Sequence, residues 1–427
     1  MTLKAIAAAV SLLLCASGVA SAQKAVYAHF MVGIVENYTV DDWKADMVDA
    51  KSIGIDGFAL NCAPPRVDSY TPKQLSNAYQ AAGESDFKVF ISFDFAYWQN
   101  GTYGFCSRFA YDTALIISTL QNYSSLPGQA KYDGGAIAST FVGEFFDWAP
   151  VKAVLNVTAL PNMEDPIQVT ELKTSFDGAF SWYAWPTDGG NSIIPGSMTT
   201  IWDDKFVLWL TSRPYMMPVS PWFSTHFNSK NWVFICEQLI TDRWEQVLAI
   251  QPQLVEIISW NDFGESHYIS GPQPHHSDDG SSQWAAGMPH DAWRHIMKPY
   301  IAAYKAGASA PTVDADGLVY WYRPTPKDIR CTNDTLPAPN GISLLADVVF
   351  VTTMLTAPAT LTVTSGSLPP ISVNISAGIV TSNFTIGVGT QTFAVNRNGT
   401  KILGGDGGLK IASTCTTYNF NAYVGGF

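Results

Sequence analysis

The chain has 427 residues, of which 47% are hydrophobic, 13% aromatic and 14% charged, and its formal net charge is −12. A chain of this length exceeds one ordinary hydrophobic core, so we expect one large domain and one smaller domain. The low charged fraction argues against a disordered chain. The acidic balance repels phosphates and so disfavours nucleic acid and anionic membranes as partners. An uncharged substrate fits this composition better.

The first 22 residues have the pattern of a secretory signal peptide. The segment "MTLKAIAAAVSLLLCASGVASA" contains one lysine, an apolar run from Ala5 to Cys15 and a small-residue cleavage site at Ala20-Ser21-Ala22. The apolar run is too short to span a bilayer, and no later run has the pattern of a transmembrane helix. We therefore expect residues 1–22 to be removed and the mature protein to be secreted.

Sequons and cysteines fit an exported chain. Exported N-x-S/T sites can carry glycans on exposed loops, and eight are present, at Asn37, Asn100, Asn122, Asn156, Asn333, Asn374, Asn383 and Asn398. Five cysteines remain after the signal peptide. Cys331 can pair with Cys415 and Cys62 with Cys106, which leaves Cys236 as a buried free thiol. The odd number excludes complete pairing within one chain, and the sequence alone does not fix the connectivity.

Apolar runs alternate with helical patterns from Ala25 to about Gly307. Examples are "AVYAHFMVGIV" before "TVDDWKADMVDAKSIG" and "IDGFALNCA" before "TPKQLSNAYQAAGES". Thr39 with Asp42 predicts a capping box for the first helix, and Thr71 before Pro72 predicts the N-cap of the second. Eight strand–helix units in roughly 280 residues indicate an α/β fold, a (β/α)8 TIM-like barrel. We place this barrel at residues 23–307.

The pattern changes after about Ala308. Short segments rich in Val, Ile and Thr, such as "ATLTVTSGS", "ISVNISAG" and "TQTFAVNRNG", alternate with period two between turn residues. Such alternation is typical of a β-sandwich. Residues 308–427 are therefore predicted to form a smaller C-terminal β-sandwich domain.

Two carboxylates end the last predicted barrel strand, in "VEIISWNDFGESHYIS". Asp262 and Glu265 are three residues apart, and in a straight strand they would point to opposite faces. If Trp260 points inward, even spacing makes Asp262 point inward too, and Gly264 then allows a bend that returns Glu265 over the barrel mouth. The C-terminal face of such a barrel is where catalytic side chains lie.

Other predicted strand ends supply further acids and aromatic rings. The acids are Asp94 in "FISFDFAYW", Glu144 in "TFVGEFFDW", and Glu164 and Asp165 in "LPNMED"; the rings are Trp98, Trp148, Trp182, Trp185, Trp222 and Trp260. Sugars stack their C–H faces on rings and donate hydroxyl hydrogens to carboxylates, and glycoside hydrolysis needs two carboxyl groups. A carbohydrate site is therefore predicted at this face.

Several separated motifs in the same order resemble the fungal α-1,3-glucanases, or mutanases, of glycoside hydrolase family 71. They are "AHFMVGIVENYTVDDWKADMVDAKSIGIDGFALN", "FISFDFAYW", "STFVGE" and "ISWNDFGESHYI". The resemblance implies a secreted or wall-associated inverting endo-enzyme whose partner is the polysaccharide α-1,3-glucan. It places Asp262 and Glu265 on the catalytic pair and Asp94 on a further essential acid. The Ser/Thr-rich linker and extra binding module of some members are missing.

Each site assignment has a structural alternative. An acid at a strand end can simply cap the next helix, and for Glu144, Glu164 or Asp165 alone that reading is favoured by about two to one. Tryptophans in a large barrel belong to the core more often than to a ligand surface. The histidines are more often polar wall or core groups than ligands. The residues kept as substrate-binding candidates are Glu144, Trp98, Trp182, Trp222, Trp260, His226 and His267.

Neither a zinc motif, a calcium loop nor a phosphate loop is present, so we expect no metal and no cofactor. We also expect a monomer, although no motif in the sequence bears on the oligomeric state. Glu265 has the longer side chain past the glycine bend and is predicted to be the general acid. Asp262 is then the base, with Asp94 across the mouth. Two other readings stay open. One is a catalytically inactive protein that binds wall glucan, and the other is a secreted α-glycosidase of different linkage specificity.

Overall fold

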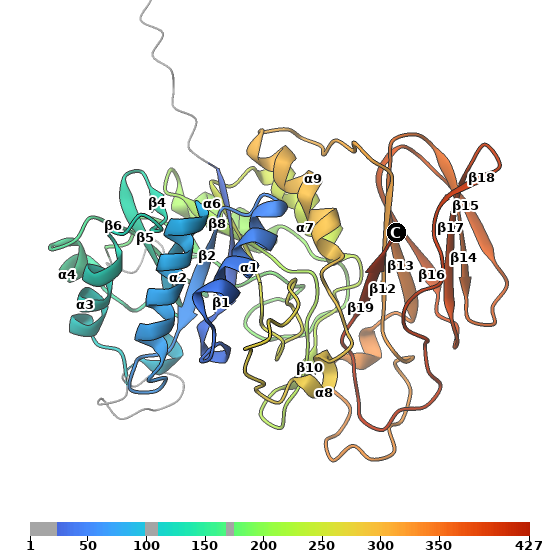
Figure 1. The fold of residues 1–427 in the computed structure, drawn as a ribbon, viewed down its shortest axis with the longest axis horizontal. Helices are drawn as coiled ribbons and strands as arrows, with labels where there is room; N and C mark the ends of the chain where they lie inside the picture. Colours follow the sequence, from blue (N-terminus) through green and yellow to red (C-terminus); the bar gives the residue numbers. More distant parts are fainter. Residues whose placement is uncertain (1–23, 99–109, 168–174) are drawn as a thin grey trace, which may run out of the picture.

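The computed structural model describes residues 24–98, 110–167 and 175–427 (Figure 1). The predicted signal peptide, the sequon at Asn100 and the pairing of Cys62 with Cys106 fall outside these residues. The asparagines of the other seven sequons are all exposed. None of the helices in the described ranges combines the length and the hydropathy needed to cross a bilayer.

A parallel sheet forms the core of the N-terminal part. In spatial order its strands are β6 (Val157–Pro161), β5 (Gly135–Phe141), β3 (Lys88–Asp94), β2 (Gly57–Cys62), β1 (Ala25–Met31), β11 (Leu254–Ile257), β8 (Tyr215–Val219) and β7 (Ala179–Phe180). The short β4 (Lys131–Tyr132) adds antiparallel to β5. These strands are buried almost throughout, because layers cover both faces of a parallel sheet.

The sheet is curled, and its two end strands approach each other. A parallel bridge joins Asn162 to Phe180, and the Met163 N–H donates to the Phe180 carbonyl at 2.9 Å. The predicted α/β class with a parallel-rich sheet is confirmed. Closure into a (β/α)8 barrel stays a prediction.

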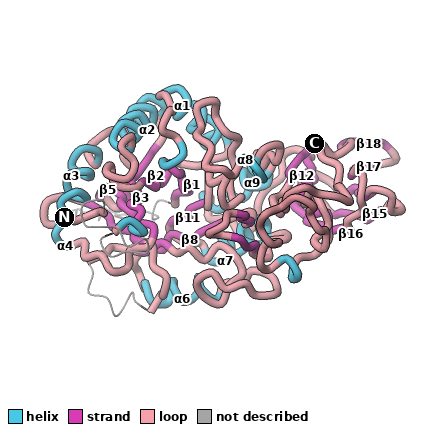
Figure 2. The backbone as a smooth tube through the Cα atoms, turned by 90° about the horizontal axis from the view of Figure 1, so that it is seen from below, coloured by secondary structure: helices cyan, strands magenta, loops and turns pink. Residues whose placement is uncertain are grey.

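Helices surround the sheet, as Figure 2 shows for α1, α2, α3 and α6. The helices are α1 (Val40–Ser52), α2 (Thr71–Ser85), α3 (Thr113–Tyr123), α4 (Ala149–Lys152), α6 (Ile201–Leu210), α7 (Leu239–Ile250), α8 (Ser282–Ala285) and α9 (Trp293–Lys305). The capping box is confirmed, since the Thr39 N–H donates to Asp42 at 2.8 Å and the Asp42 N–H donates to the Thr39 hydroxyl at 3.3 Å. The N-cap of α2 is Tyr70, and the Thr71 hydroxyl instead donates to the Ala63 carbonyl.

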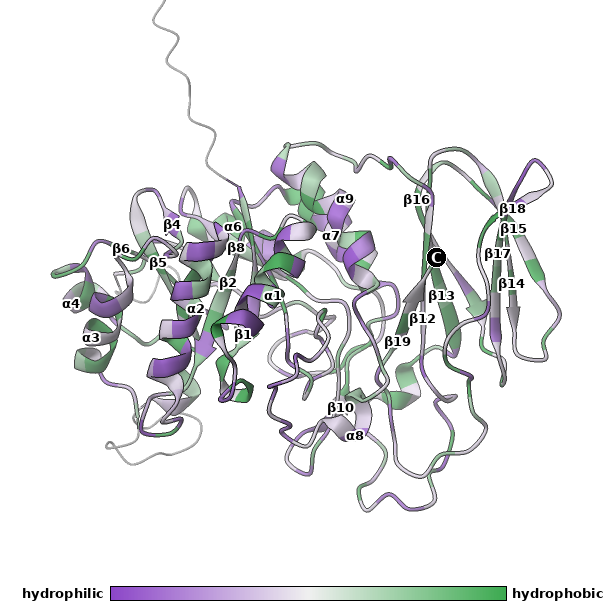
Figure 3. Ribbon diagram, viewed as in Figure 1, coloured by the Kyte–Doolittle hydropathy of each residue, from purple (hydrophilic) through white to green (hydrophobic). Residues whose placement is uncertain are grey.

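Two antiparallel four-stranded sheets make up the C-terminal part. One has the order β16 (Gly378–Thr385), β13 (Val348–Leu355), β12 (Gly317–Tyr322) and β19 (Tyr423–Gly426); the other has the order β15 (Ile371–Ile375), β14 (Ala359–Ser365), β17 (Gln391–Arg397) and β18 (Thr400–Leu403). One buried apolar cluster contains Val349 and Val351 from the first sheet and Leu361 and Phe393 from the second. Figure 3 shows β12, β13 and β19 in the green of hydrophobic residues, whereas α2 carries several purple, hydrophilic turns.

The two parts share buried contacts. Trp321 on β12 packs in the same apolar cluster as Trp293 on α9, and its indole N–H donates to the Glu237 carbonyl at 2.9 Å. The predicted disulfide between Cys331 and Cys415 is present. Cys236 is buried and has no disulfide partner among the described residues, as predicted. The short hairpin of β9 (Ser224–His226) and β10 (Asn231–Val233) also lies beside the C-terminal part.

Candidate active site

The loop after β11 brings the two predicted acids together. The strand ends at Ile257, and the chain then folds back so that the Ser259 N–H donates to the His267 carbonyl at 2.9 Å. Asp262 stabilises this loop through two hydrogen bonds to other residues of the loop. Its N–H donates to the Ser259 hydroxyl at 2.8 Å, and its Oδ1 accepts the Glu265 N–H at 2.8 Å. Asp262 and Glu265 therefore lie on one side of the loop, as their spacing at a strand end predicts.

Gly264 occupies a crowded position in this loop and does not form the special backbone bend that the sequence predicts. Its φ is outside the left-handed region, which Ser266 adopts instead with φ 61°. A Cβ added at Gly264 would lie 3.0 Å from Asp279 Oδ2 and 3.1 Å from the Phe227 ring. The predicted bend that only glycine can adopt is therefore wrong, and a larger residue here would instead press against the Asp279 and Phe227 side chains.

Glu265 is held by two nitrogen groups. Lys230 Nζ lies 2.7 Å from Glu265 Oε1, and His267 Nε2 lies 3.1 Å from Glu265 Oε2. Burial of the carboxylate raises its pKa, but the His267 hydrogen bond and the Lys230 charge together outweigh burial and lower the pKa of Glu265 to about 2. The side chain remains 16% exposed, so it can reach a ligand as an ionised carboxylate.

The other two acids have the opposite shift. Burial, together with the negative charge of Glu265, raises the pKa of Asp262, although His267 Nε2 lies 3.8 Å away and opposes the rise. Burial also raises the pKa of Asp94 at the end of β3 to about 6, against a hydrogen bond from the Ala96 N–H at 3.0 Å. The Lys230 charge acts on all three carboxyl groups. This pattern is the reverse of the acid and base roles predicted from side-chain length.

A cavity of about 370 Å3 opens beside this cluster. The charged side chains of its wall are those of Glu144, Glu164, Lys230 and Glu265. The aromatic side chains of its wall are Phe141, Trp182, Tyr183, Trp185, Phe223, Trp232 and Phe234. Within the described part of the chain, no group hydrogen-bonds the buried Oε2 of Glu144. A cavity with carboxylates and flat rings has the groups that bind a sugar chain.

Two tryptophans predicted to bind substrate lie in the core. Trp260 is fully buried and packs against Phe58, with the Arg294 guanidinium over its ring. Trp222 is 5% exposed, and its indole N–H donates to the Phe420 carbonyl at 3.0 Å. Both predictions are wrong, because neither ring has a face open to a ligand.

Of the other two tryptophans predicted to bind substrate, Trp182 lines the cavity and Trp98 does not. Trp182 is half-buried in the cavity wall and meets the His29 ring edge-on with 5.0 Å between centroids. Trp98 is half-buried too, but it packs on Phe95 and Phe146 outside the residues that line the cavity. Trp182 therefore stays a substrate-binding candidate with direct support from its position.

The two predicted histidines are positioned by protein groups. His267 is fully buried behind Glu265, and its Nδ1 lies 2.9 Å from the Ser259 hydroxyl. His226 points away from the cavity toward Asp334 in the C-terminal part, with 2.9 Å between Nε2 and Oδ2. Neither side chain lines the cavity, so their predicted contact with substrate stays a prediction without support from position.

Three polar residues of this region were missed from the sequence. Lys230 lies in the turn "FNSKNW", where a lysine is typical of solvated surface. His29 and Glu256 form a buried pair with 2.7 Å between Nδ1 and Oε1. The only available signal was their place on adjacent predicted strands, a polar residue inside each apolar run.

One group of described residues could hold a metal ion. Single ligand atoms of Asp262, Glu265 and His267 all lie within 4.8 Å of one another. The Lys230 ammonium already contacts Glu265 at 2.7 Å, so a cation bound here would compete with it.

Comparison with known proteins identifies the family. The chain is 60% identical to the protein named Mutanase Pc12g07500 of Penicillium rubens, over 95% of this chain and 89% of that protein. It is 37% identical to glucan endo-1,3-alpha-glucosidase agn1 of Schizosaccharomyces pombe, over 95% of each chain. The ascus wall endo-1,3-alpha-glucanase of the same yeast is 27% identical, over 93% of this chain and 96% of that one. The family model described as glycosyl hydrolase family 71 matches residues 22–427, and the chain belongs to this family.

Proposed function

We propose that the protein is a glycoside hydrolase that cleaves internal α-1,3-glucosidic bonds of fungal wall α-1,3-glucan or mutan. The names of the relatives support this linkage and substrate. The observation that carries the proposal is the carboxyl pair of Asp262 and Glu265 beside a ring-lined cavity, with pKa values shifted in opposite directions. Two carboxyl groups whose environments separate their pKa values suit acid and base roles.

The roles follow from protonation. Glu265 stays ionised and acts as the base that takes a proton from water, while Lys230 and His267 hold it in place. Asp262, whose pKa is raised, is the better proton carrier of the two and gives a proton to the leaving glycosidic oxygen. Asp94, whose pKa is also raised, is a second carboxyl group of this site that can hold a proton. This assignment replaces the one based on side-chain length.

The family resemblance favours inversion at the anomeric carbon. Inverting glycosidases hold their two carboxyl groups about 6.5 to 9.5 Å apart so that water fits between base and sugar. One carboxylate oxygen of Asp262 lies within 4.8 Å of one of Glu265. This short spacing is nearer the roughly 5–5.5 Å of retaining enzymes, so the proposal of inversion rests on the family resemblance and on movement of the two groups apart when substrate enters.

Further parts of the proposal concern the whole chain. We propose that the curled sheet closes into a (β/α)8 barrel at residues 23–307 and that residues 308–427 form a β-sandwich. The bridge between Asn162 and Phe180 and the shared apolar cluster support this. We also propose a monomer that is secreted after removal of residues 1–22, and the exposed sequon asparagines support secretion.

The test is incubation of the purified protein with insoluble α-1,3-glucan, with α-1,4-glucan and β-1,3-glucan as controls. Soluble oligosaccharides released only from α-1,3-glucan, with the β-anomer seen first by NMR, would support the proposal. Release of the α-anomer would overturn inversion alone. Binding without any release would favour the inactive wall-binding protein, and cleavage of the α-1,4 control would favour a different α-glycosidase.

A further inference from the structure

The β9–β10 hairpin connects the candidate active site to the C-terminal part. Lys230, which holds Glu265, lies in the turn of this hairpin. At the base of the hairpin the Ser224 N–H donates to the Glu265 carbonyl at 3.1 Å, and the Ser224 hydroxyl donates to the Ser266 hydroxyl at 3.1 Å. The hairpin therefore contacts both the backbone and the carboxylate of Glu265.

On its other side the hairpin pairs with a segment of the C-terminal part, residues 331–340, which we call the clamp. Backbone bonds join Val233 N–H to the Asn340 carbonyl at 2.9 Å and Asn340 N–H to the Asn231 carbonyl at 3.0 Å. The Asn231 amide donates to the Pro337 carbonyl at 2.8 Å. His226 contacts Asn231 Oδ1 at 2.7 Å through Nδ1 and Asp334 Oδ2 at 2.9 Å through Nε2.

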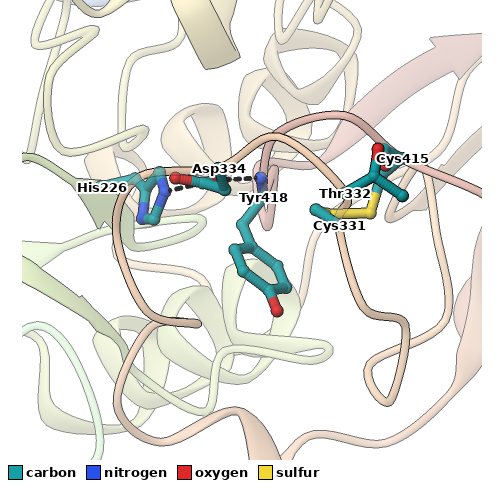
Figure 4. Close-up of a disulfide and its surroundings, with 6 residues drawn as sticks. All are labelled: His226, Cys331, Thr332, Asp334, Cys415 and Tyr418. Carbon is teal, nitrogen blue, oxygen red and sulfur yellow. Dashed lines mark hydrogen bonds and ion pairs between the residues drawn. A yellow bond between two sulfur atoms is a disulfide. The ribbon is translucent and has the colours of Figure 1, made fainter.

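The clamp is itself held by the chain around the disulfide, as Figure 4 shows. Cys331 is bonded to Cys415, and the Thr332 N–H donates to the Cys415 carbonyl at 3.1 Å. Asp334 accepts the Tyr418 N–H at 2.6 Å on the same oxygen that meets His226. Burial raises the pKa of Asp334, but these hydrogen bonds outweigh it and lower the pKa. Asp334 is thus an ionised, fixed acceptor for the hairpin histidine.

We propose that Asp334 and His226 are positioning residues for catalysis, and that through them the C-terminal part places Lys230 against Glu265. The inference rests on the proposed function. Lys230 is 44% exposed on a flexible four-carbon stem, so its contact with Glu265 depends on where the hairpin backbone is held. The clamp therefore fixes the hairpin backbone from which Lys230 reaches Glu265.

The test is the pH dependence of kcat/KM for His226→Ala, with Lys230→Met as the reference and Thr381→Val as the matched control. The Thr381 hydroxyl on β16 donates to the Thr241 hydroxyl on α7 at 3.2 Å, across the same two parts, and neither residue belongs to the hairpin or the clamp. Without the Lys230 ammonium beside it, the pKa of Glu265 rises. The acidic limb of the kcat/KM profile, where activity falls as Glu265 is protonated, then moves to higher pH. We expect His226→Ala to move it the same way, by less than Lys230→Met. In the double variant His226→Ala/Lys230→Met, the acidic limb should lie at the same pH as in Lys230→Met alone.

A structural role alone would lower the melting temperature and the active fraction without moving the limb, as we expect for Thr381→Val. Hydrogen exchange of residues 224–233 and 259–267 gives a readout that needs no substrate. Exchange should rise in both segments for His226→Ala and in neither for Thr381→Val. If His226→Ala left both the acidic limb and the hydrogen exchange of the two segments unchanged, the proposed positioning role of His226 and Asp334 would be wrong. If wild type is inactive on α-1,3-glucan, the proposed function fails, and the exchange result alone decides the clamp.

Discussion

The interior of the sheet and the loop at its end each contain a histidine beside a glutamate, and the two glutamates behave differently. In the interior, His29 lies 2.7 Å from Glu256 and both are buried. Burial raises the pKa of Glu256 against the opposing His29 contact, and no described group hydrogen-bonds its second oxygen. In the loop, His267 lies 3.1 Å from Glu265, and the pKa of Glu265 falls to about 2.

The difference between the two pairs is Lys230. Glu265 has a cation at 2.7 Å on its other oxygen and is part of the cavity wall, whereas among the described residues Glu256 contacts His29 and its second oxygen has no hydrogen-bond partner. A second charged partner thus helps to lower the pKa of a carboxyl group that burial alone would raise. The comparison teaches that the reactive state of this site depends on a residue 35 positions away in the chain.

Removing the carboxyl groups of the catalytic pair should have the largest effect. Glu265→Gln and Asp262→Asn preserve shape, so each should lower kcat by about 10²–10⁴-fold while glucan binding stays largely intact. Turnover and binding to insoluble α-1,3-glucan measure the two effects. An α-glucosyl fluoride, whose leaving group needs little protonation, should rescue Asp262→Asn and not Glu265→Gln. Near-normal turnover of both variants would contradict the mechanism.

The buried pair of His29 and Glu256 should affect the free energy of unfolding more than the ionisation of Glu265. Glu256→Ala leaves the His29 ring nitrogen buried without its acceptor, at a cost of about 1–3 kcal/mol in the free energy of unfolding. Chemical denaturation measures this change. Lys230→Met is the matched comparison, because its partly exposed side chain should contribute little to unfolding. Equal destabilisation by the two variants would remove the distinction drawn between the pairs.

The tryptophans offer a smaller test. Trp182→Ala removes a ring from the cavity wall, and loss of one stacking contact of about 1 kcal/mol should raise KM about five-fold to tenfold. Trp260→Phe changes a ring buried beside Phe58, so it should lower the melting temperature and leave KM unchanged. Steady-state kinetics on a soluble α-1,3-oligosaccharide measures both. A raised KM for Trp260→Phe alone would reverse the assignment of the two rings.

Local sequence signals predicted local structure well. The capping box of Thr39 and Asp42 needs only four residues, and the alternation of "ATLTVTSGS" is the alternating burial of β14. The proximity of Asp262 and Glu265 was also predictable, since both lie in one loop. The disulfide followed from the shared C-terminal location of its cysteines.

Predictions failed where they extended a local rule beyond its element. Even spacing placed Trp260 and Asp262 on one face, but β11 ends at Ile257, so strand alternation no longer applies. Lys230 was missed because a charged turn gives no local sign of a contact made 35 residues away. The role assignment made from side-chain length stays untested, and the pKa shifts of Asp262 and Glu265 favour the opposite one because side-chain length says nothing about the partners that set a pKa.

The pH profile of kcat/KM for wild type and Lys230→Met tests the central claim most directly. In wild type Glu265 stays ionised down to about pH 2, so the acidic limb should lie well below the ordinary glutamate value of about 4.3. The basic limb, set by the protonated carboxyl groups, should keep the optimum acidic. Lys230→Met should move the acidic limb upward toward that ordinary value and leave the basic limb less changed. An acidic limb at the same pH in both proteins would contradict the claim that Lys230 keeps Glu265 ionised.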